Sequence, residues 1–368
     1  IESAVRADIY GRLERLKPVA AYGSAACGAD ILCLECVQEL GGELHIVLPF
    51  GPDAFRTQSV DLRPEGRWGE RFERLLENAK EVLVISQRPP PIGESIFEYN
   101  NLILTGLAKL RAQMLDTDLH GIAVWDGKPA AGEGGTGSIV SLWRDAGIPL
   151  DHVMVGDGAA PPEPVAAPTT GRLTRQSRES GDTWAFEYKI ETMLFADAVG
   201  YSRLTEDQIP LFFDSYARSI ADFNQRTPCK PVHVETAGDG MYMVFDDPET
   251  AARYALGLSE RINGEDWASK GLPHDLNMRI GLHCGPVFVG RDPITGLPLY
   301  TGNHTSRTAR IEPITPPGLV YASSAFAAVA AAHDIESLHF SYIGRTQLAK
   351  DYGVLPLYHV KERFRPPS

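Results

Sequence analysis

A proline-rich stretch near the middle of the chain constrains the fold more than any other feature of the sequence. Residues 157–183 are rich in Ala, Thr, Ser and Gly and show no apolar periodicity, which is typical of a linker. The four prolines of this stretch are Pro161, Pro162, Pro164 and Pro168. The 368 residues therefore divide into two segments that are each long enough to bury a core. We predict one domain at 1–156 and another at 184–368.

The composition limits the ligands that this chain can bind. A hydrophobic fraction of 43% and a charged fraction of 23% are ordinary for a globular protein. A formal net charge of -13 disfavours broad contact with nucleic acid or with an anionic membrane. No apolar run is long enough to cross a bilayer, and the N-terminus lacks the sections of a signal peptide. We expect a cytosolic protein with a small ligand and no nucleic-acid or membrane partner. Because the first residue is Ile1 rather than Met, an upstream segment of unknown nature is compatible with the sequence.

The five cysteines are expected to be reduced thiols, because their number is odd and they are scattered over a large chain. Cys33 and Cys36 form a CxxC pair without a second pair or a His cluster that would complete a zinc site. A buried helix face explains the pair better than redox or metal chemistry.

The first segment alternates short apolar runs with helical patterns. We predict strands at 19–22, 43–48, 81–85 and 120–125. We predict helices at 30–40, 68–78, 99–115 and 138–145. Alternating strands and helices favour a parallel sheet covered on both faces, so the expected fold is a doubly wound, Rossmann-like α/β domain.

Two glycine-containing turns of this segment lie where ligands bind such sheets, between a strand and the following helix. They are residues 23–30 and 132–138. Small residues let backbone amides approach a phosphate, although a tight turn without any ligand explains each motif equally well. The candidate ligand-binding residues are Gly23, Ser24, Gly28, Gly134, Gly135 and Thr136.

Together with Trp125-Asp126-Gly127, these turns resemble the SLOG family of Rossmann-like nucleotide-sensing and nucleotide-processing domains, which carry a Gly-Gly-x-Gly-Thr type of loop before a helix. This sequence has Gly-Gly-Thr-Gly and lacks the family's catalytic Glu at the usual spacing. The resemblance therefore implies a sensor of a nucleotide-like small ligand rather than a second enzyme.

The second segment has the element order of an α+β ferredoxin-like core. We predict strands at 188–196, 231–236, 241–245, 276–283 and 287–290. One amphipathic helix carries Ile209, Phe212 and Tyr216 on one face, and a second begins at Pro248 after its cap Asp247. The resulting order β-α-β-β-α-β is that of the ferredoxin-like fold.

Two aspartates of this segment stand at the ends of apolar runs. Asp197 follows Phe195-Ala196, and Asp239 lies between two glycines. Each has an ordinary explanation by itself, since Asp-Gly is a common hairpin turn and Asp often caps a strand end. Their strands are neighbours in a ferredoxin-like sheet, so we expect both carboxylates at one rim. Two carboxylates and substrate phosphates are what two Mg²⁺ or Mn²⁺ ions need for phosphoryl transfer.

Three successive motifs resemble the class III nucleotide cyclases, at residues 194–202, 235–240 and 279–287, within a similar region from Trp184 to Val360. The resemblance implies an enzyme that converts a nucleoside triphosphate to a 3′,5′-cyclic monophosphate and pyrophosphate. It also implies that Asp197 and Asp239 bind two Mg²⁺ or Mn²⁺ ions, with help from the Ala198 carbonyl.

Residues 302–312 are similar to the family segment that carries a catalytic Asn and, four residues later, an Arg. Arg310 falls on the Arg and would neutralise charge on the phosphate, whereas by itself it is equally typical of a surface helix residue that contacts Glu312 or solvent. Ser306 falls where the Asn is expected, so either Asn303 substitutes or the ribose is held differently. Lys350 resembles the lysine that binds the triphosphate.

The base-reading positions of the resemblance disfavour ATP. Glu235 stands where adenylate cyclases have Lys, and a carboxylate accepts hydrogen bonds from guanine's edge but meets adenine N1 poorly. The second position falls on Leu299 or Tyr300, whose bulk favours a pyrimidine slightly over GTP. This pattern resembles the Pycsar-type cyclases of bacterial antiphage defence, which make the second messengers cyclic UMP or cyclic CMP.

Class III cyclases build each site from two protomers, so the resemblance implies a two-fold homodimer with two equivalent sites. A rival interpretation is a non-catalytic nucleotide-binding sensor with a degenerate site, since Ser306 replaces the family Asn.

Overall fold

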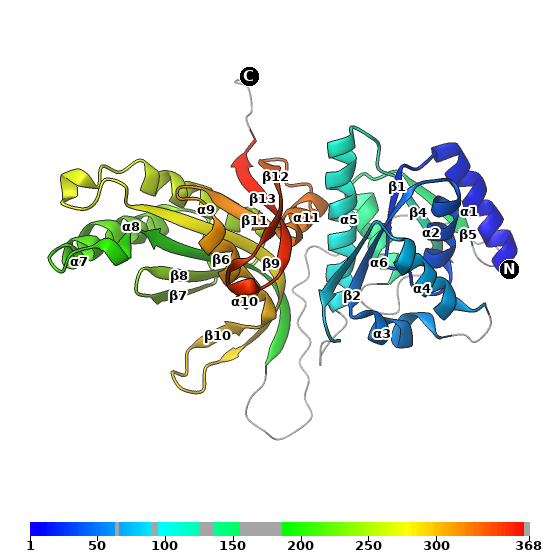
Figure 1. Ribbon diagram of the computed structural model, residues 1–368, viewed down its shortest axis with the longest axis horizontal. Coiled ribbons are helices and arrows are strands. Elements are labelled where there is room, and N and C mark those ends of the chain that lie inside the picture. Colours follow the sequence, from blue (N-terminus) through cyan, green and yellow to red (C-terminus); the bar gives the residue numbers. More distant parts are fainter. Residues whose placement is uncertain (63–65, 90–94, 126–134, 155–185, 364–368) are drawn as a thin grey trace. The chain divides into compact units, whose positions relative to one another are not determined.

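The computed structural model describes residues 1–62, 66–89, 95–125, 135–154 and 186–363. The predicted linker and Gly134 lie outside these residues. The described chain forms two compact units, one with the elements from α1 to β5 and one with the sheet that begins at β6 (Figure 1). The division into two domains follows the sequence prediction in outline, whereas the exact boundaries stay a prediction.

The first unit contains parallel strands flanked by helices. Strands β1 (Ala20–Gly23), β2 (Glu43–Phe50) and β3 (Glu81–Ser86) pair in that order, and β4 (Gly121–Trp125) pairs with β5 (Leu150–Met154). The helices are α1 (Glu2–Leu16), α2 (Ala29–Glu39), α3 (Pro52–Phe55), α4 (Trp68–Asn78), α5 (Ser95–Leu115) and α6 (Thr136–Asp145). All but the first residue of β2 are buried, as expected of a parallel strand covered on both faces.

The predicted strands and helices of this unit are all present with small shifts at their ends. Sequence analysis missed α1, α3 and β5; of α1, only Ile9 and Leu13 are buried. The described strands form two parallel sheets rather than one, so a single doubly wound, Rossmann-like sheet stays a prediction. Cys36 is buried on α2 and burial raises the pKa of Cys33, which agrees with a packing role for the CxxC pair.

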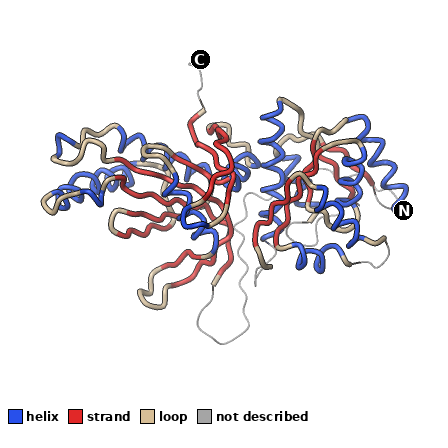
Figure 2. The backbone as a smooth tube through the Cα atoms, in the orientation of Figure 1, coloured by secondary structure: helices blue, strands red, loops and turns tan. Residues whose placement is uncertain are grey.

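The second unit is built on one sheet in the order β12-β13-β11-β9-β6-β8-β7, with β10 paired to β9. Figure 2 draws the strands in red and the helices in blue. Its strands are β6 (Glu187–Val199), β7 (His233–Ala237), β8 (Gly240–Phe245), β9 (Asn277–Arg291), β10 (Pro298–Thr301), β11 (Val320–Ser323), β12 (Leu338–Gln347) and β13 (Val354–Glu362). Its helices are α7 (Gln208–Leu211), α8 (Arg218–Arg226), α9 (Pro248–Asn263), α10 (Asn303–Ile311) and α11 (Ser324–Ala332). A π-helical turn at Phe212–Ala217 joins α7 to α8.

The neighbour order β9-β6-β8-β7 is fourth, first, third and second in chain order, with every pair antiparallel. This is the ferredoxin-like arrangement that the element order predicted. The predicted cap also forms, because the Asp247 side chain accepts a hydrogen bond from the Thr250 amide.

One detail of the sequence prediction was wrong. The strands expected at 276–283 and 287–290 form a single strand, β9. Pro286 does not interrupt it: Pro286 stays paired with Ile190 of β6, and the pairings on the other side, to β11 at residues 280–282 and to β10 at residues 288–291, leave it out. A proline that lacks an amide hydrogen is tolerated where no neighbour needs that hydrogen.

Glycines on β9 let helix α10 lie close to the sheet. A Cβ atom on Gly281 would lie 2.7 Å from the Glu312 amide nitrogen, and one on Gly285 would lie 2.2 Å from His304 Nδ1. His283, between them on the same face, lies 2.8 Å from His304 through its Nε2. The alternation Arg279, Gly281, His283, Gly285 therefore places α10 on one face of the sheet.

Among the helices that the structure describes, we find no segment with both the length and the apolar character needed to cross a bilayer.

Candidate active site

Two carboxylates meet at one rim of the second unit's sheet. Asp197 lies near the end of β6, and Asp239 lies in the turn between β7 and β8, where Gly238 has a φ of 65°. Asp197 pairs with Gly240, the residue after Asp239, and this register brings the two carboxyl groups within hydrogen-bonding reach. The two aspartates converge as the sequence predicted.

Burial and the nearby charge of Asp197 both raise the pKa of Asp239. The two acids therefore repel one another when both are ionised. A cation bound between the two carboxylates would reduce this repulsion.

A basic residue holds one of these carboxylates. Arg279 pairs with Asp197 across β9 and β6, and its Nη2 donates to Asp197 Oδ2 at 2.9 Å. Its Nε lies 2.9 Å from Glu312 Oε1, and burial raises the pKa of Glu312 to about 7. Arg279 thus orients Asp197 through one oxygen. Sequence analysis quoted Arg279 only as part of a motif and gave no role to either residue of this ion pair.

The donor set fits a hard divalent cation that also contacts a substrate. Asp197 and Asp239 supply carboxylate oxygens within hydrogen-bonding reach of one another, and Ala198, whose carbonyl the resemblance also implies as a ligand, follows Asp197 on β6. Within the described residues, no group of three or more His, Cys, Asp or Glu side chains is arranged to hold a metal ion. Mg²⁺ commonly takes only one or two protein carboxylates and completes its shell with water and phosphate oxygens. The site therefore suits such an ion in the presence of a phosphate ligand.

Helix α10 presents three predicted residues on one face. Asn303, Ser306 and Arg310 are spaced three and four residues apart, which places them on the same side of a helix. Asn303 and Ser306 are exposed, while His304, Thr308 and Ile311 are buried. The face that carries the predicted residues is therefore directed away from the sheet.

Arg310 is a half-buried cation without a counter-ion. In the part of the chain that the structure describes, no carboxylate pairs with it, and its Nε is buried without a hydrogen-bond partner. The ion pair with Glu312 that the sequence also allowed does not form, since Glu312 pairs with Arg279. A half-buried cation without an ion-pair partner gains electrostatic energy when it binds an anion.

Lys350 lies beside the same helix. Leu348, two residues earlier, packs in a buried cluster with Ile311 of α10, and the Tyr352 hydroxyl donates to the Asn303 carbonyl at 3.3 Å. The exposed Lys350 stands between these two anchors with a φ of 58°. The structure thus places the predicted triphosphate-binding lysine next to α10.

A layer of rings joins the carboxylate rim to Glu235. Phe195 pairs with Tyr242, and Tyr242 pairs with Glu235, so the three share the face that carries Asp197. The Phe195 and Tyr242 rings stack at 4.7 Å. Glu235 Oε1 lies 2.6 Å from His233 Nε2. Sequence analysis missed Tyr242 and His233. His233 lies two residues before Glu235 in a predicted strand, so a shared face of that strand could have been predicted.

The two candidates for the second base-reading position, Leu299 and Tyr300, are successive residues of β10. Tyr300 packs against the ring layer, with its ring 4.8 Å from that of His233 and its carbonyl 3.3 Å from the Tyr242 hydroxyl. Leu299 precedes it on β10, and successive side chains of a strand point to opposite faces. Tyr300 therefore joins the face of Glu235, and Leu299 does not.

The predicted ligand-binding turns of the first unit lie at helix starts. Gly23, Ser24 and Gly28 precede α2, and Ser24 Oγ accepts a hydrogen bond from Asn100 at 2.8 Å. The Ser24 and Ala26 amides bond to the carboxylate of Asp30. Gly135 and Thr136 begin α6, which follows a strand of the other small sheet. Ligand binding at these turns stays a prediction.

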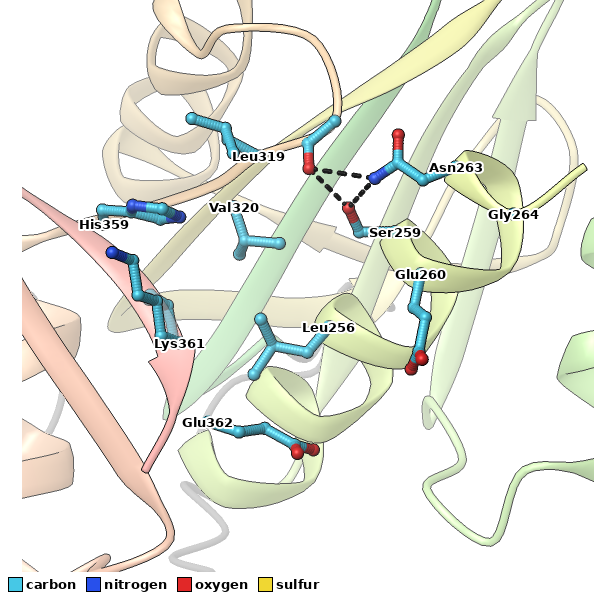
Figure 3. A pocket seen from close by; sticks show the side chains of 12 residues that line it. Leu256, Ser259, Glu260, Asn263, Gly264, Leu319, Val320, His359, Lys361 and Glu362 are labelled. Atoms are coloured by element: carbon cyan, nitrogen blue, oxygen red, sulfur yellow. Dashed lines mark hydrogen bonds between the residues drawn. The ribbon is translucent and has the colours of Figure 1, made fainter. Parts of the chain in front are cut away.

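A separate hollow of about 550 Å³ lies between α9 and β13 (Figure 3). The side chains of Ser259 and Asn263 close one end by donating to the Gly318 carbonyl. Glu260, Glu362 and Lys361 also line it. It shares no residue with the carboxylate rim or with the exposed face of α10, so we assign it no part in the site.

Residues 186–352 match the family described as "Adenylate and Guanylate cyclase catalytic domain". The chain is 26% identical over 164 residues to the guanylate cyclase soluble subunit beta-2 of Rattus norvegicus, and the match covers 41% of this chain and 23% of that protein. The chain thus spans about a quarter of the length of this curated relative.

Part of the chain is also similar to solved cyclase structures. One is the guanylate cyclase domain of RhGC from Catenaria anguillulae in complex with GTP, with 19% identity and a TM-score of 0.41 over 48% of this chain and 100% of that one. Another is the adenylyl cyclase CyaB from P. aeruginosa, with 16% identity and a TM-score of 0.42 over 50% of this chain and 100% of that one.

Proposed function

We propose that this chain, whose residues 186–352 match the adenylate and guanylate cyclase catalytic domain family, is a class III nucleotide cyclase that converts a nucleoside triphosphate to its 3′,5′-cyclic monophosphate and pyrophosphate. The observation that carries the proposal is the convergence of Asp197 and Asp239 at one rim. The two carboxylates repel one another, and Arg279 contacts only the Oδ2 oxygen of Asp197. Other carboxylate oxygens therefore remain to bind cations.

The reaction forms a bond between the ribose 3′ oxygen and the α-phosphorus and breaks the bond from that phosphorus to the bridging oxygen of pyrophosphate. Asp197, Asp239 and the Ala198 carbonyl would hold two Mg²⁺ or Mn²⁺ ions. When bound, such ions lower the pKa of the 3′-hydroxyl and neutralise the leaving pyrophosphate. Arg279 keeps Asp197 in place through one oxygen and leaves the other free to act as a ligand.

The exposed face of α10 and the adjoining turn would bind the phosphates and the sugar. Arg310 has no counter-ion among the residues that the structure describes, so its charge is available to the phosphate on which negative charge develops. Lys350 would bind the outer phosphates. Ser306 offers a shorter hydrogen-bonding group than the carboxamide usual at this position, and Asn303 is exposed one turn earlier on the same face. These two residues would hold the ribose.

We assign the base-binding role to Glu235, with Leu299 or Tyr300 as the second position and Tyr300 favoured by its place on the same face. ATP is disfavoured, because a carboxylate at this position repels the lone pair of adenine N1. UTP, CTP and GTP remain the candidate substrates.

We expect a two-fold homodimer, because cyclases of this class take the metal-binding aspartates and the arginine segment of one site from different protomers. From its resemblance to the SLOG family, the first unit would sense a nucleotide-like ligand. From the resemblance of the base-reading positions to Pycsar-type cyclases, the product would be a second messenger in antiphage defence. The sequence composition favours a cytosolic location. A phage-challenge assay comparing wild type with an inactive variant tests the defence role.

A non-catalytic nucleotide sensor is the second candidate function. Ser306 in place of the family Asn is the observation that favours it, because a weaker hold on the transition state permits binding without turnover.

Incubation with each of the four triphosphates and Mn²⁺ separates the two functions. Wild-type chain should release pyrophosphate and a cyclic monophosphate from one base, whereas Asp197→Ala should form none. Asp145→Ala, which removes an exposed acid at the end of α6, serves as the control and should match wild type. Tight nucleotide binding by wild type without any product would support the sensor instead.

A further inference from the structure

We propose that His233 determines base specificity by occupying one oxygen of Glu235, which leaves the other oxygen to select a base with a single ring N–H, namely uracil. The inference rests on the proposed function, in which Glu235 faces the base. It narrows the substrate to UTP and gives a role to a histidine that sequence analysis left unnoticed.

The two side chains form a pair on one face of β7. His233 and Glu235 are two residues apart on a strand, so both project to the same side of the sheet. The Nε2 to Oε1 distance is 2.6 Å. The His233 side chain is 9% exposed and that of Glu235 is 49% exposed. A nearly buried ring therefore holds a carboxylate whose remaining surface is open to a ligand.

Packing fixes the ring that makes this contact. The His233 ring lies 4.8 Å from the Tyr300 ring and 6.1 Å from the Tyr242 ring. Tyr242 stacks in turn on Phe195, two residues before Asp197. The orientation of Glu235 is thus linked through three rings to the strand that carries a metal-binding aspartate.

The direction of the hydrogen bond follows from chemistry. An ionised carboxylate only accepts, so the imidazole must donate from Nε2. Oε1 is then occupied by a charge-assisted hydrogen bond. The other oxygen, Oε2, is the acceptor that Glu235 can offer to the edge of a base.

The four bases differ in what they present to such an acceptor. Adenine and cytosine each present one amino donor beside a lone pair on the central ring nitrogen of the pairing edge, and an ionised carboxylate repels that lone pair. Guanine presents two adjacent donors, N1–H and N2–H, which suit a carboxylate with both oxygens available. Uracil presents one donor, N3–H, between two carbonyl oxygens. The hydrogen on His233 Nε2 lies against Glu235 Oε1 and offsets part of its negative charge. A uracil carbonyl oxygen next to N3–H is therefore repelled less by Oε1 than it would be by an oxygen without a hydrogen bond.

His233→Phe tests the inference, since it retains an aromatic ring in the layer and removes the N–H that occupies Oε1. We measure kcat/KM for UTP and GTP with Mn²⁺. Wild type should prefer UTP, and the variant should shift the ratio of GTP to UTP by about tenfold or more toward GTP, the change expected when one discriminating hydrogen bond is altered. His339→Phe, a histidine exposed on β12, is the matched control and should leave the ratio unchanged.

A double-mutant cycle shows whether the effect passes through Glu235. Glu235→Gln should reduce the UTP preference, and adding His233→Phe should change the ratio no further. If His233→Phe fails to fold in a thermal melt, Glu235→Gln by itself must still reduce the preference for UTP over GTP. A wild-type preference for GTP, ATP or CTP, or an unchanged ratio in active His233→Phe, overturns the inference while leaving the cyclase activity intact.

Failure of the proposed function is recognised separately, as absence of product from wild type with all four triphosphates. The inference is then tested by calorimetric binding of UTP and GTP to wild type and His233→Phe. The same shift in the ratio of the two affinities supports it, and equal ratios overturn it.

Discussion

Two buried acidic turns of this molecule differ in how their charge is satisfied. In the first unit, the Asp30 carboxylate bonds to the Ser24 and Ala26 amides of its own turn, so the atoms that a phosphate would use are already occupied. In the second unit, Asp197 and Asp239 face one another, and the half-buried Arg310 has no counter-ion in the described chain. Both turns contain small residues next to a strand.

The comparison teaches that a glycine-rich turn by itself does not make a binding site. A site is indicated where the fold leaves charges uncompensated, because an uncompensated buried charge gains more from a ligand than a satisfied one does.

Asp239→Asn should have the largest effect, and it tests whether the uncompensated charges of the second unit mark its active site. It removes one carboxylate from the rim, so we expect kcat for the cyclase reaction to fall by about 10²-fold or more, in the range lost when a key electrostatic group is removed. The melting temperature should stay constant or rise, because the substitution relieves repulsion from Asp197. Activity within a factor of three of wild type would contradict the assignment of this rim.

Arg310→Ala is expected to have the next largest effect on activity. Removal of the unpaired cation should lower kcat by about 10²-fold, with a smaller change in KM, because its charge acts mainly on the transition state. Arg307→Ala, three residues earlier on the same helix, is the comparison variant. Equal losses in both variants would mean that general helix charge, and not the position of Arg310, is responsible.

Asp30→Ala should change stability rather than chemistry. The substitution leaves the Ser24 and Ala26 amides without their acceptor, which costs roughly 1–3 kcal/mol in the free energy of unfolding of the first unit. Denaturant unfolding and turnover by the second unit are measured on the same preparation. An increase in phosphate or nucleotide binding by this variant would show that Asp30 had been occupying a ligand site.

The smallest effect that we predict concerns pH. Burial raises the pKa of Glu312 to about 7, so the folded protein holds this proton more tightly than the unfolded chain does. Its stability contribution is therefore present at low pH and is lost as pH rises from about 4.5 to about 7.

In Glu312→Gln this loss should be absent, which makes the unfolding free energy of wild type fall relative to that of the variant by on the order of 1–3 kcal/mol across the window. Thermal melts of both proteins between pH 4.5 and 8 measure the difference. Parallel curves would show that Glu312 does not bind its proton in this range.

Local sequence patterns predicted most of the elements and the central feature of the site. The apolar run before Asp197 and the Gly-Asp-Gly turn lie within short segments, and the four-strand order followed from the order of elements along the chain. The cap at Asp247 was predictable for the same reason, because its partner Thr250 is three residues away.

Local sequence patterns could not predict contacts between residues that are far apart in the sequence. Arg279 reaches Asp197 across 82 residues, and the ring of His233 meets that of Tyr300 from a strand much earlier in the chain. The choice of Tyr300 over Leu299 likewise required the observed face of β10. Each of these facts depends on strand register, and a shift of one residue in register sends every side chain of a strand to the opposite face.

The sequence by itself therefore determined where strands, turns and acidic residues occur, because these depend on neighbours a few residues apart. Only the tertiary structure decided that Asp239 lies within the field of Asp197, that no carboxylate of the described residues pairs with Arg310 and that His233 contacts Glu235. Charge and hydrogen bonding act over a few ångströms of space, and the fold alone sets which residues come within that distance.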